Sequence, residues 1–220
     1  MTRKLGLIHT SATFVPVFQA LTDKYLAGKD IEVFIISDDS LIKNTIERGE
    51  LTSDTSRRVV NYVASAVEAG ADFILVTCSS IGPAVETAAT LVDVPVLRVD
   101  QPMADKAVQM GSKIGVVATL STTLEPTSDL VRRRAILAGK EIELTSRLCE
   151  GAFDALMSGN PELHDESVAS ALKELSQQVD VILLAQASMA RVVNQLSDED
   201  KKVPILASPE LAVQYLADIL

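Results

Sequence analysis

One cysteine of this 220-residue chain stands where a thiol can do chemistry. Cys78 follows the apolar run 73–77, which is typical of a buried strand, and precedes Gly82 and Pro83, which open a helix. Backbone amides at a helix start favour a thiolate, so this position predicts a pKa lowered from about 8.5 toward neutrality. Such a thiol serves as a base or nucleophile. The alternative is a small buried side chain, the commonest fate of a free cysteine.

Polar side chains at other strand ends extend this set. His9 ends the first apolar run, and its near-neutral pKa suits an acid or base. Paired with Cys78, it would form a nucleophile and base of the hydrolase kind. The other histidine, His164, falls on a polar helix face, which predicts a solvated side chain. The candidate substrate-binding residues at these strand ends are Thr10, Ser11, Ser79, Ser80, Thr119, Ser121, Thr122, Gln186 and Ser188.

Two hydroxyl-rich segments, 10–13 and 119–123, each lie between a strand and a helix. Hydroxyls and unbonded amides at a helix start predict an anion site for a carboxylate or phosphate. The alternative is ordinary N-capping and turn formation. Arg98 and Arg191, near strand ends, either clamp a carboxylate or form structural ion pairs. The acidic segment 37–40 indicates a helix cap rather than a metal site.

These segments belong to a unit that the sequence contains twice. KLGLI at 4–8 recurs as KIGVV at 113–117, an offset of 109, and VPV at 94–96 recurs as VPI at the same offset. DFILV at 72–76 recurs as DVILL at an offset of 108. Three segments in the same order indicate two copies of one supersecondary unit. Under the offset of 108, Cys78 falls opposite Gln186.

Short apolar runs alternate with helical periodicity, which predicts an α/β fold with parallel sheets. We expect two pseudo-symmetric lobes, each a four-stranded parallel sheet flanked by helices: residues 1–97 plus 206–220, and residues 98–205. Ligands of such sheets bind at the carboxyl ends of the strands, so the active-site cleft is expected between the lobes. The predicted strands are 5–9, 31–36, 73–77, 94–99, 114–118, 142–145, 181–185 and 204–207; the predicted helices are 16–26, 55–69, 83–91, 102–110, 163–179 and 209–220.

Composition narrows the functional classes. The formal net charge of −10 disfavours nucleic acid and anionic membranes as partners, because both require clustered Lys and Arg. No apolar run of about 18 residues and no secretory leader are present, so we expect a cytoplasmic protein. Its two cysteines are then expected to be free thiols. With 47% hydrophobic residues, the chain should fold without a disulfide or a metal.

The residues 77–80 (TCSS) after DFILV, the internal repeat, and DVILLA at 180–185 together resemble the aspartate/glutamate racemase superfamily. That superfamily includes amino-acid and hydantoin racemases, maleate isomerases and arylmalonate decarboxylases. The resemblance also covers IGVVAT in the middle of the chain and SPELA at 208–212. It implies a cofactor-independent enzyme without a metal, a small carboxylic or amino acid as substrate, and a possible homodimer. In racemases of this kind, one cysteine removes the α-proton and a second returns it from the opposite face.

The first cysteine element matches through Cys78, but Gln186 stands where the resemblance implies the second cysteine. A glutamine amide has no titration near neutral pH, so it cannot replace a thiol as acid or base. We therefore expect a racemase or isomerase with Cys78 as base or nucleophile and another group, such as His9 or Ser188, as second proton donor. A one-thiol decarboxylase of the arylmalonate type and a non-catalytic carboxylate-binding protein are the alternatives.

Overall fold

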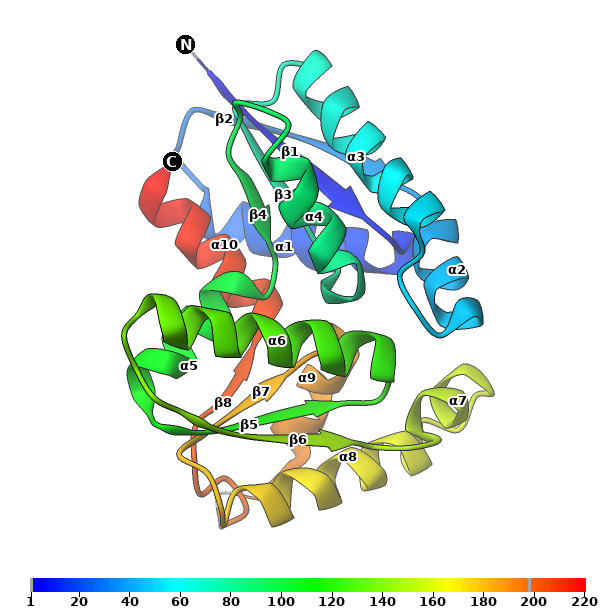
Figure 1. The fold of residues 1–220 in the computed structure, drawn as a ribbon, viewed down its shortest axis with the longest axis vertical. Helices are drawn as coiled ribbons and strands as arrows, with labels where there is room; N and C mark the ends of the chain where they lie inside the picture. The colour runs from blue at the N-terminus through cyan, green and yellow to red at the C-terminus, as the bar shows by residue number, and fades with distance from the viewer. Residues whose placement is uncertain (1, 198) are drawn as a thin grey trace. The chain divides into compact units, whose positions relative to one another are not determined.

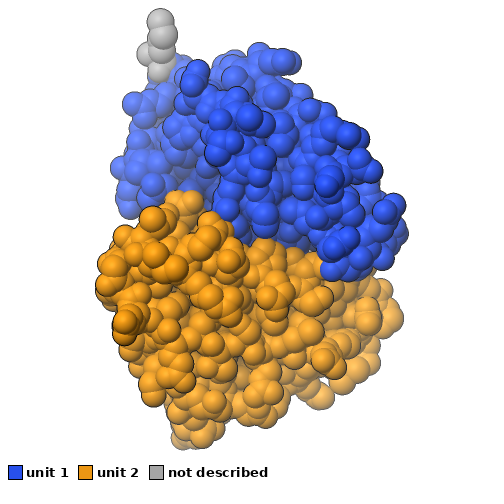
Figure 2. Space-filling model, in the orientation of Figure 1, with its two compact units in different colours: residues 1–100, 209–220 blue, residues 101–208 orange. Residues whose placement is uncertain are grey.

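The computed structural model describes residues 2–197 and 199–220. The chain divides into two compact units, residues 1–100 with 209–220 and residues 101–208 (Figure 2). Each boundary lies three residues further along the chain than the sequence predicted. The units are described in turn.

The sheet of the first unit has four parallel strands in the order β2-β1-β3-β4. The strands at the centre of this sheet are apolar on both faces. This is typical of parallel sheets, which helices cover on both sides. The strands are β1 (Arg3–His9), β2 (Ile31–Ser37), β3 (Phe73–Val76) and β4 (Val96–Arg98).

Successive side chains of these strands point to opposite faces of the sheet. Ile8 and Val76 pack with α3 and α4, whereas Leu7 and Leu75 pack with α1 and α10 (Figure 1). Even-numbered positions at the ends of β1 and β3 therefore lie on the α3/α4 face, and odd-numbered positions lie on the α1/α10 face. The helices are η1 (Ala12–Phe14), α1 (Val15–Tyr25), α2 (Ser40–Arg48), α3 (Ser53–Glu68), η2 (Ser79–Ile81), α4 (Gly82–Ala89) and α10 (Ser208–Ile219).

The second unit repeats this topology with the strand order β6-β5-β7-β8. One face of its sheet packs against α8 and α9, and the other faces α5 and α6 (Figure 1). Its strands are β5 (Lys113–Ala118), β6 (Glu143–Leu148), β7 (Val181–Leu184) and β8 (Ile205–Ala207). Its helices are α5 (Gln101–Met110), α6 (Ser121–Leu137), α7 (Ala152–Met157), α8 (Pro161–Leu175), η3 (Ala187–Met189) and α9 (Ala190–Gln195).

The predicted α/β class and both four-stranded parallel sheets are confirmed. The short helices α2, α7 and α9 lie outside the predicted helical segments, and the 17-residue α6, expected only as a helix after segment 119–123, is absent from the predicted bounds. The start of α3 also differs from the predicted residue 55: the helix begins at Ser53, and the hydroxyl of its N-cap, Thr52, accepts a hydrogen bond from the amide of Thr55. Within the described residues, no helix is both long and apolar enough to cross a membrane.

Candidate active site

The thiol of Cys78 lies at the carboxyl edge of the first sheet, between β3 and η2. The hydroxyl of Thr10, from the loop after β1, donates a hydrogen bond to its sulfur. The backbone amides of Ser80 and Ile81 donate two more from the start of η2. Thr10 and Ser80 are buried, so these donors are held in place. The predicted grouping of Cys78 with Thr10, Ser79 and Ser80 is therefore present in one unit.

The pKa of the Cys78 thiol departs from the prediction. Burial raises it above the ordinary value, and the hydrogen bonds from Thr10, Ser80 and Ile81 oppose this shift without reversing it. The sequence had predicted a lowered pKa from the helix start alone, which leaves out the desolvation of the strand end. Cys78 therefore carries its proton at neutral pH. In this state it is a proton donor, and becoming a base requires a rise in pH or a bound ligand that favours the thiolate.

Removing the hydroxyl of Thr10 is expected to raise the pKa of Cys78 further, because the hydrogen bond from Thr10 favours the thiolate. We expect the iodoacetamide labelling of wild-type Cys78 to have a midpoint above about 8.5, the ordinary value of a free thiol. In Thr10→Val the midpoint moves higher, whereas Thr10→Ser keeps the hydroxyl and stays near wild type. The midpoint is read by mass spectrometry of the peptide that carries residue 78. A midpoint in Thr10→Val at or below that of wild type contradicts the assignment.

His9 lies on the other face of the same sheet. Its side chain is fully buried and packs against Phe18 of α1, with 5.3 Å between the ring centroids. Position 9 is odd and position 78 is even, so the imidazole and the thiol extend to opposite sides of the strands. The expected pair of Cys78 and His9 is not formed.

The surroundings of His9 also define its protonation. The Thr77 hydroxyl lies 2.8 Å from His9 Nδ1 and 3.2 Å from the carbonyl oxygen of Ile8, so Nδ1 has a hydrogen-bond partner in either tautomer of the imidazole. The Nε2 atom is buried without a hydrogen-bond partner among the described residues. Burial lowers the pKa of His9 to about 4. The imidazole is therefore neutral at physiological pH.

The segment 10–13 is not an empty anion site in this structure. The Oδ1 atom of Asp39 accepts a hydrogen bond of 2.7 Å from the backbone amide of Ala12, at the start of η1. The hydroxyls of Ser11 and Thr13 hydrogen-bond to each other at 2.8 Å. A carboxylate of the chain itself thus takes the donor that the sequence offered to a ligand. In segment 37–40, Asp39 is the N-cap of α2 but its side chain bonds to Ala12 instead, and Asp38 Oδ1 accepts a hydrogen bond of 3.0 Å from the amide of Ser40, the first residue of α2.

The second unit carries the equivalent arrangement with glutamine in place of cysteine. Gln186 Oε1 accepts two hydrogen bonds from Thr119, 2.6 Å from the backbone nitrogen and 3.0 Å from the hydroxyl. Thr119 is buried, and Ser121 and Thr122 follow it in the first turn of α6. The hydroxyl oxygen of Thr122 is buried with no partner among the described residues. Ser188 lies in η3 and is partly exposed.

Arg98 lies against the start of α4, the helix that follows Cys78 and η2. Its guanidinium is 2% exposed and binds Asp100 through two hydrogen bonds of 3.0 and 2.8 Å and Glu86 through one of 2.7 Å. It also packs on Gly82, where an added Cβ would lie 2.2 Å from the guanidinium carbon. Arg98 is therefore the structural ion pair that the sequence offered as one alternative. The role of Gly82 was missed, although glycine at a helix start is a signal for close approach.

Gly82→Ala is expected to destabilise the first unit, because the methyl group overlaps a guanidinium that two carboxylates hold in place. We expect a loss of about 1–3 kcal/mol in the free energy of unfolding by urea. Thr87→Ala, on the exposed face of the same helix, is the control and should change it by less than about 0.5 kcal/mol. Equal stability of the two variants is incompatible with this packing.

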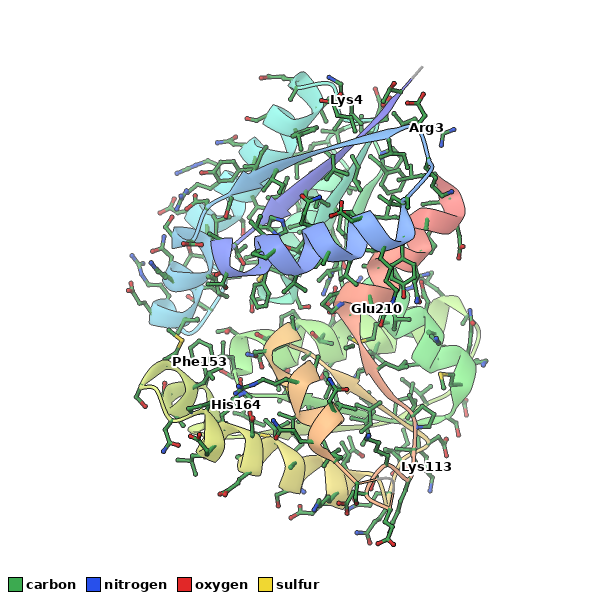
Figure 3. All side chains as sticks on the ribbon, turned by 180° about the vertical axis from the view of Figure 1, so that it is seen from behind. Arg3, Lys4, Lys113, Phe153, His164 and Glu210 are labelled. Carbon is green, nitrogen blue, oxygen red and sulfur yellow. The ribbon has the colours of Figure 1, made fainter. Side chains whose placement is uncertain are left out.

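The remaining candidates are structural. His164 is fully buried near the start of α8 and hydrogen-bonds through Nδ1 to Asp165 at 2.7 Å, so the predicted solvated histidine is wrong (Figure 3). Arg191 forms an ion pair with the same carboxylate. Both α8 and α9 line a groove of about 500 Å³ that includes Asp165 and Arg191 but none of the predicted site residues. Among the described residues, no group of three His, Cys, Asp or Glu side chains is placed to hold a metal ion.

Comparison with known proteins agrees with this geometry. The model of the Asp/Glu/Hydantoin racemase family matches residues 5–216, nearly the whole chain. The structure of a glutamate racemase from Thermus thermophilus, solved with β-chloro-D-alanine, is similar with a TM-score of 0.73 at 18% identity. The match covers 100% of this chain and 80% of the racemase chain. An allantoin racemase from Klebsiella pneumoniae has a TM-score of 0.66 at 18% identity, covering 99% of this chain and 90% of its own.

An aspartate racemase homologue from Pyrococcus horikoshii is similar over 100% of this chain and 99% of its own, with a TM-score of 0.68 and 11% identity. At these identities the solved structures show a common fold, whereas their substrates differ from one another. The role of each site residue must therefore come from the geometry of this chain.

Proposed function

Because the chain belongs to the Asp/Glu/hydantoin racemase family, we propose that it is a cofactor-independent enzyme that transfers a proton at the carbon next to a carboxylate. Its substrate is a small carboxylic or amino acid, and Cys78 is the group that transfers the proton. The observation that carries the proposal is the sulfur at the carboxyl edge of the first sheet, which accepts hydrogen bonds from Thr10, Ser80 and Ile81. Such donors stabilise the sulfur when it gives up its proton.

A racemase or isomerase reaction is the first candidate. The Cys78 thiolate takes the α-proton, the electron pair stays on the carbon as an enolate-like carbanion, and a proton is returned from the other side. That return requires a second group that can hold a proton. Gln186 cannot serve, and His9 is neutral and extends to the sheet face away from Cys78. Ser188 or a bound water remains for this role.

A one-thiol decarboxylase is the second candidate, and the protonated state of Cys78 favours it. In this reaction the bond from the α-carbon to a carboxylate breaks and carbon dioxide leaves with the electron pair remaining on the carbon. The Cys78 thiol donates its proton to that carbon, and the thiolate regains a proton from water. Only one titratable group is needed. A substrate with two carboxylates on one carbon fits this chemistry.

The direct test is incubation in deuterium oxide with panels of amino acids, hydroxy acids and malonates. Deuterium exchange at the α-carbon with all carboxyl groups retained identifies a racemase or isomerase. Release of carbon dioxide identifies a decarboxylase. If no member of the panels exchanges, isomerises or decarboxylates, the chain lacks the proposed activity. The homodimer implied by the family resemblance stays a prediction, to be tested by light scattering.

The pH dependence of activity is expected to separate the two reactions. Since burial raises the pKa of Cys78, a reaction that needs the thiolate gains rate as pH rises through that raised pKa. A reaction that needs the thiol loses rate over the same range. In Thr10→Val, the pH range over which the rate changes should move to higher pH for either reaction. A profile of kcat/KM that is flat above pH 8 rules out both roles for the thiol.

A further inference from the structure

The amide of Gln186 has an orientation that chemistry alone determines. A backbone N–H can only donate a hydrogen bond, so the Gln186 atom 2.6 Å from the Thr119 nitrogen must be the oxygen. The Thr119 hydroxyl, 3.0 Å away, occupies the second acceptor position of the same oxygen. The Nε2 group is therefore the end of the amide that remains for other contacts. No described residue accepts a hydrogen bond from it.

The first unit contains the equivalent contact, with cysteine at the position of Gln186. Thr10 and Thr119 are equivalent under the offset of 109, and Cys78 and Gln186 are equivalent under the offset of 108. In both units the buried threonine donates its hydroxyl to the following acceptor, which is sulfur in one and the amide oxygen in the other. The threonine contact is thus retained, while the group that receives it changes from a thiol, which exchanges a proton, to an amide, which has no titration near neutral pH and donates hydrogen bonds through its other end.

The surroundings of Gln186 add donors of the same kind. The N-cap of α6 is Leu120, which has no polar side chain to satisfy the first amides of that 17-residue helix. The hydroxyl of Thr122, in the first turn, is buried with no partner among the described residues. Buried polar atoms are rarely left without a partner unless a ligand or water provides one. In the first unit the equivalent amide is already bonded to Asp39, whereas the residue at the matching register after β6 is Glu150, which is exposed.

We infer that Gln186, oriented by Thr119, donates hydrogen bonds from Nε2 to a carboxylate oxygen of a small-molecule ligand. Thr119 is the positioning residue, and this inference rests on the proposed function, which supplies the substrate class. The ligand is a small carboxylic acid in its ionised form, because the donors of this site favour a negative charge.

The test uses the full chain, isotopically labelled, with malonate and succinate as probes. We expect the side-chain NH₂ signals of Gln186, assigned by their loss in Gln186→Glu, to shift during titration of the wild type. Gln186→Glu retains the size but replaces the donor with an anion, so the Kd for malonate should rise at least about tenfold. Thr119→Val removes the hydroxyl and should raise it about threefold, whereas Thr119→Ser restores it.

Three outcomes overturn the inference: unshifted Gln186 signals, no binding of either probe by wild type, or a Gln186→Glu variant that binds malonate within twofold of wild type. The signal shift is measured in the wild type, and if Gln186→Glu folds poorly the loss of the signals in Gln186→Ser gives the assignment. Cys78→Ala separates this result from the proposed function. It should bind malonate like wild type while losing proton transfer. Proton transfer that persists in Cys78→Ala would contradict the proposed function and would leave the inference about Gln186 unaffected.

Discussion

Cys78→Ala is expected to lose proton transfer by at least about 10³-fold, because alanine has no proton to give or take at the position where Thr10, Ser80 and Ile81 donate hydrogen bonds. The measurement is α-deuterium exchange or carbon dioxide release with the substrate that the panels identify. Cys149→Ala is the matched control. Cys149 is the only other cysteine of the chain, is 4% exposed, and packs in the core of the second unit. It should retain nearly full activity.

Cys78→Ser refines the same result. The serine hydroxyl can keep the hydrogen bonds but is a much weaker acid than a thiol. The activity of Cys78→Ser should therefore remain close to that of Cys78→Ala. If Cys78→Ala retains wild-type activity, the thiol is a structural residue. If the wild type itself is inactive on every substrate of the panels but binds carboxylates, the chain is a carboxylate-binding protein that has kept the fold without the reaction.

Gln186→Cys is expected to increase racemisation, because it adds a second thiol to a protein whose proposed reaction uses Cys78 alone. Position 186 is equivalent to Cys78 in the internal repeat, and in the first unit the cysteine at that strand end accepts a hydrogen bond from its threonine. With one enantiomer as substrate, we expect inversion to increase at least about tenfold, which corresponds to a change of about 1.4 kcal/mol in the barrier. Polarimetry or chiral chromatography measures the product.

Gln186→Ser is the control for this gain, because it shortens the side chain without adding a group that titrates near neutral pH. An increase in both variants would mean that space, rather than a second thiol, limits the reaction. Unchanged inversion in Gln186→Cys, together with an intact wild-type reaction, would show that position 186 does not meet the substrate.

The elements of this fold were accessible from the sequence because each depends on local periodicity. Apolar runs at 4–8 and 113–117 and their repeats predict the strands, and both sheets have the predicted parallel strands. The grouping of Thr10 with Cys78 also follows from sequence, since parallel strands bring their carboxyl ends to one edge.

Other features depend on tertiary structure. The raised pKa of Cys78 results from burial by segments distant in sequence, which outweighs the local effect of the helix start. The contact of Asp39 with Ala12 requires the register of β1 against β2, in which His9 lies opposite Ser37. The burial of His164 depends on the packing around α8, and its sequence neighbours Asp165 and Glu166 indicated a polar face.

The alternation of side chains along β1 sets a limit on how the first unit can acquire new chemistry. No rotamer of His9 brings its ring to the α3/α4 face, because the backbone of the strand lies between them. One position further along, the side chain of residue 10 already touches the Cys78 sulfur. Position 10 is therefore the place on β1 from which an imidazole could reach Cys78, and the single substitution Thr10→His would place a base beside a thiol that otherwise holds its proton.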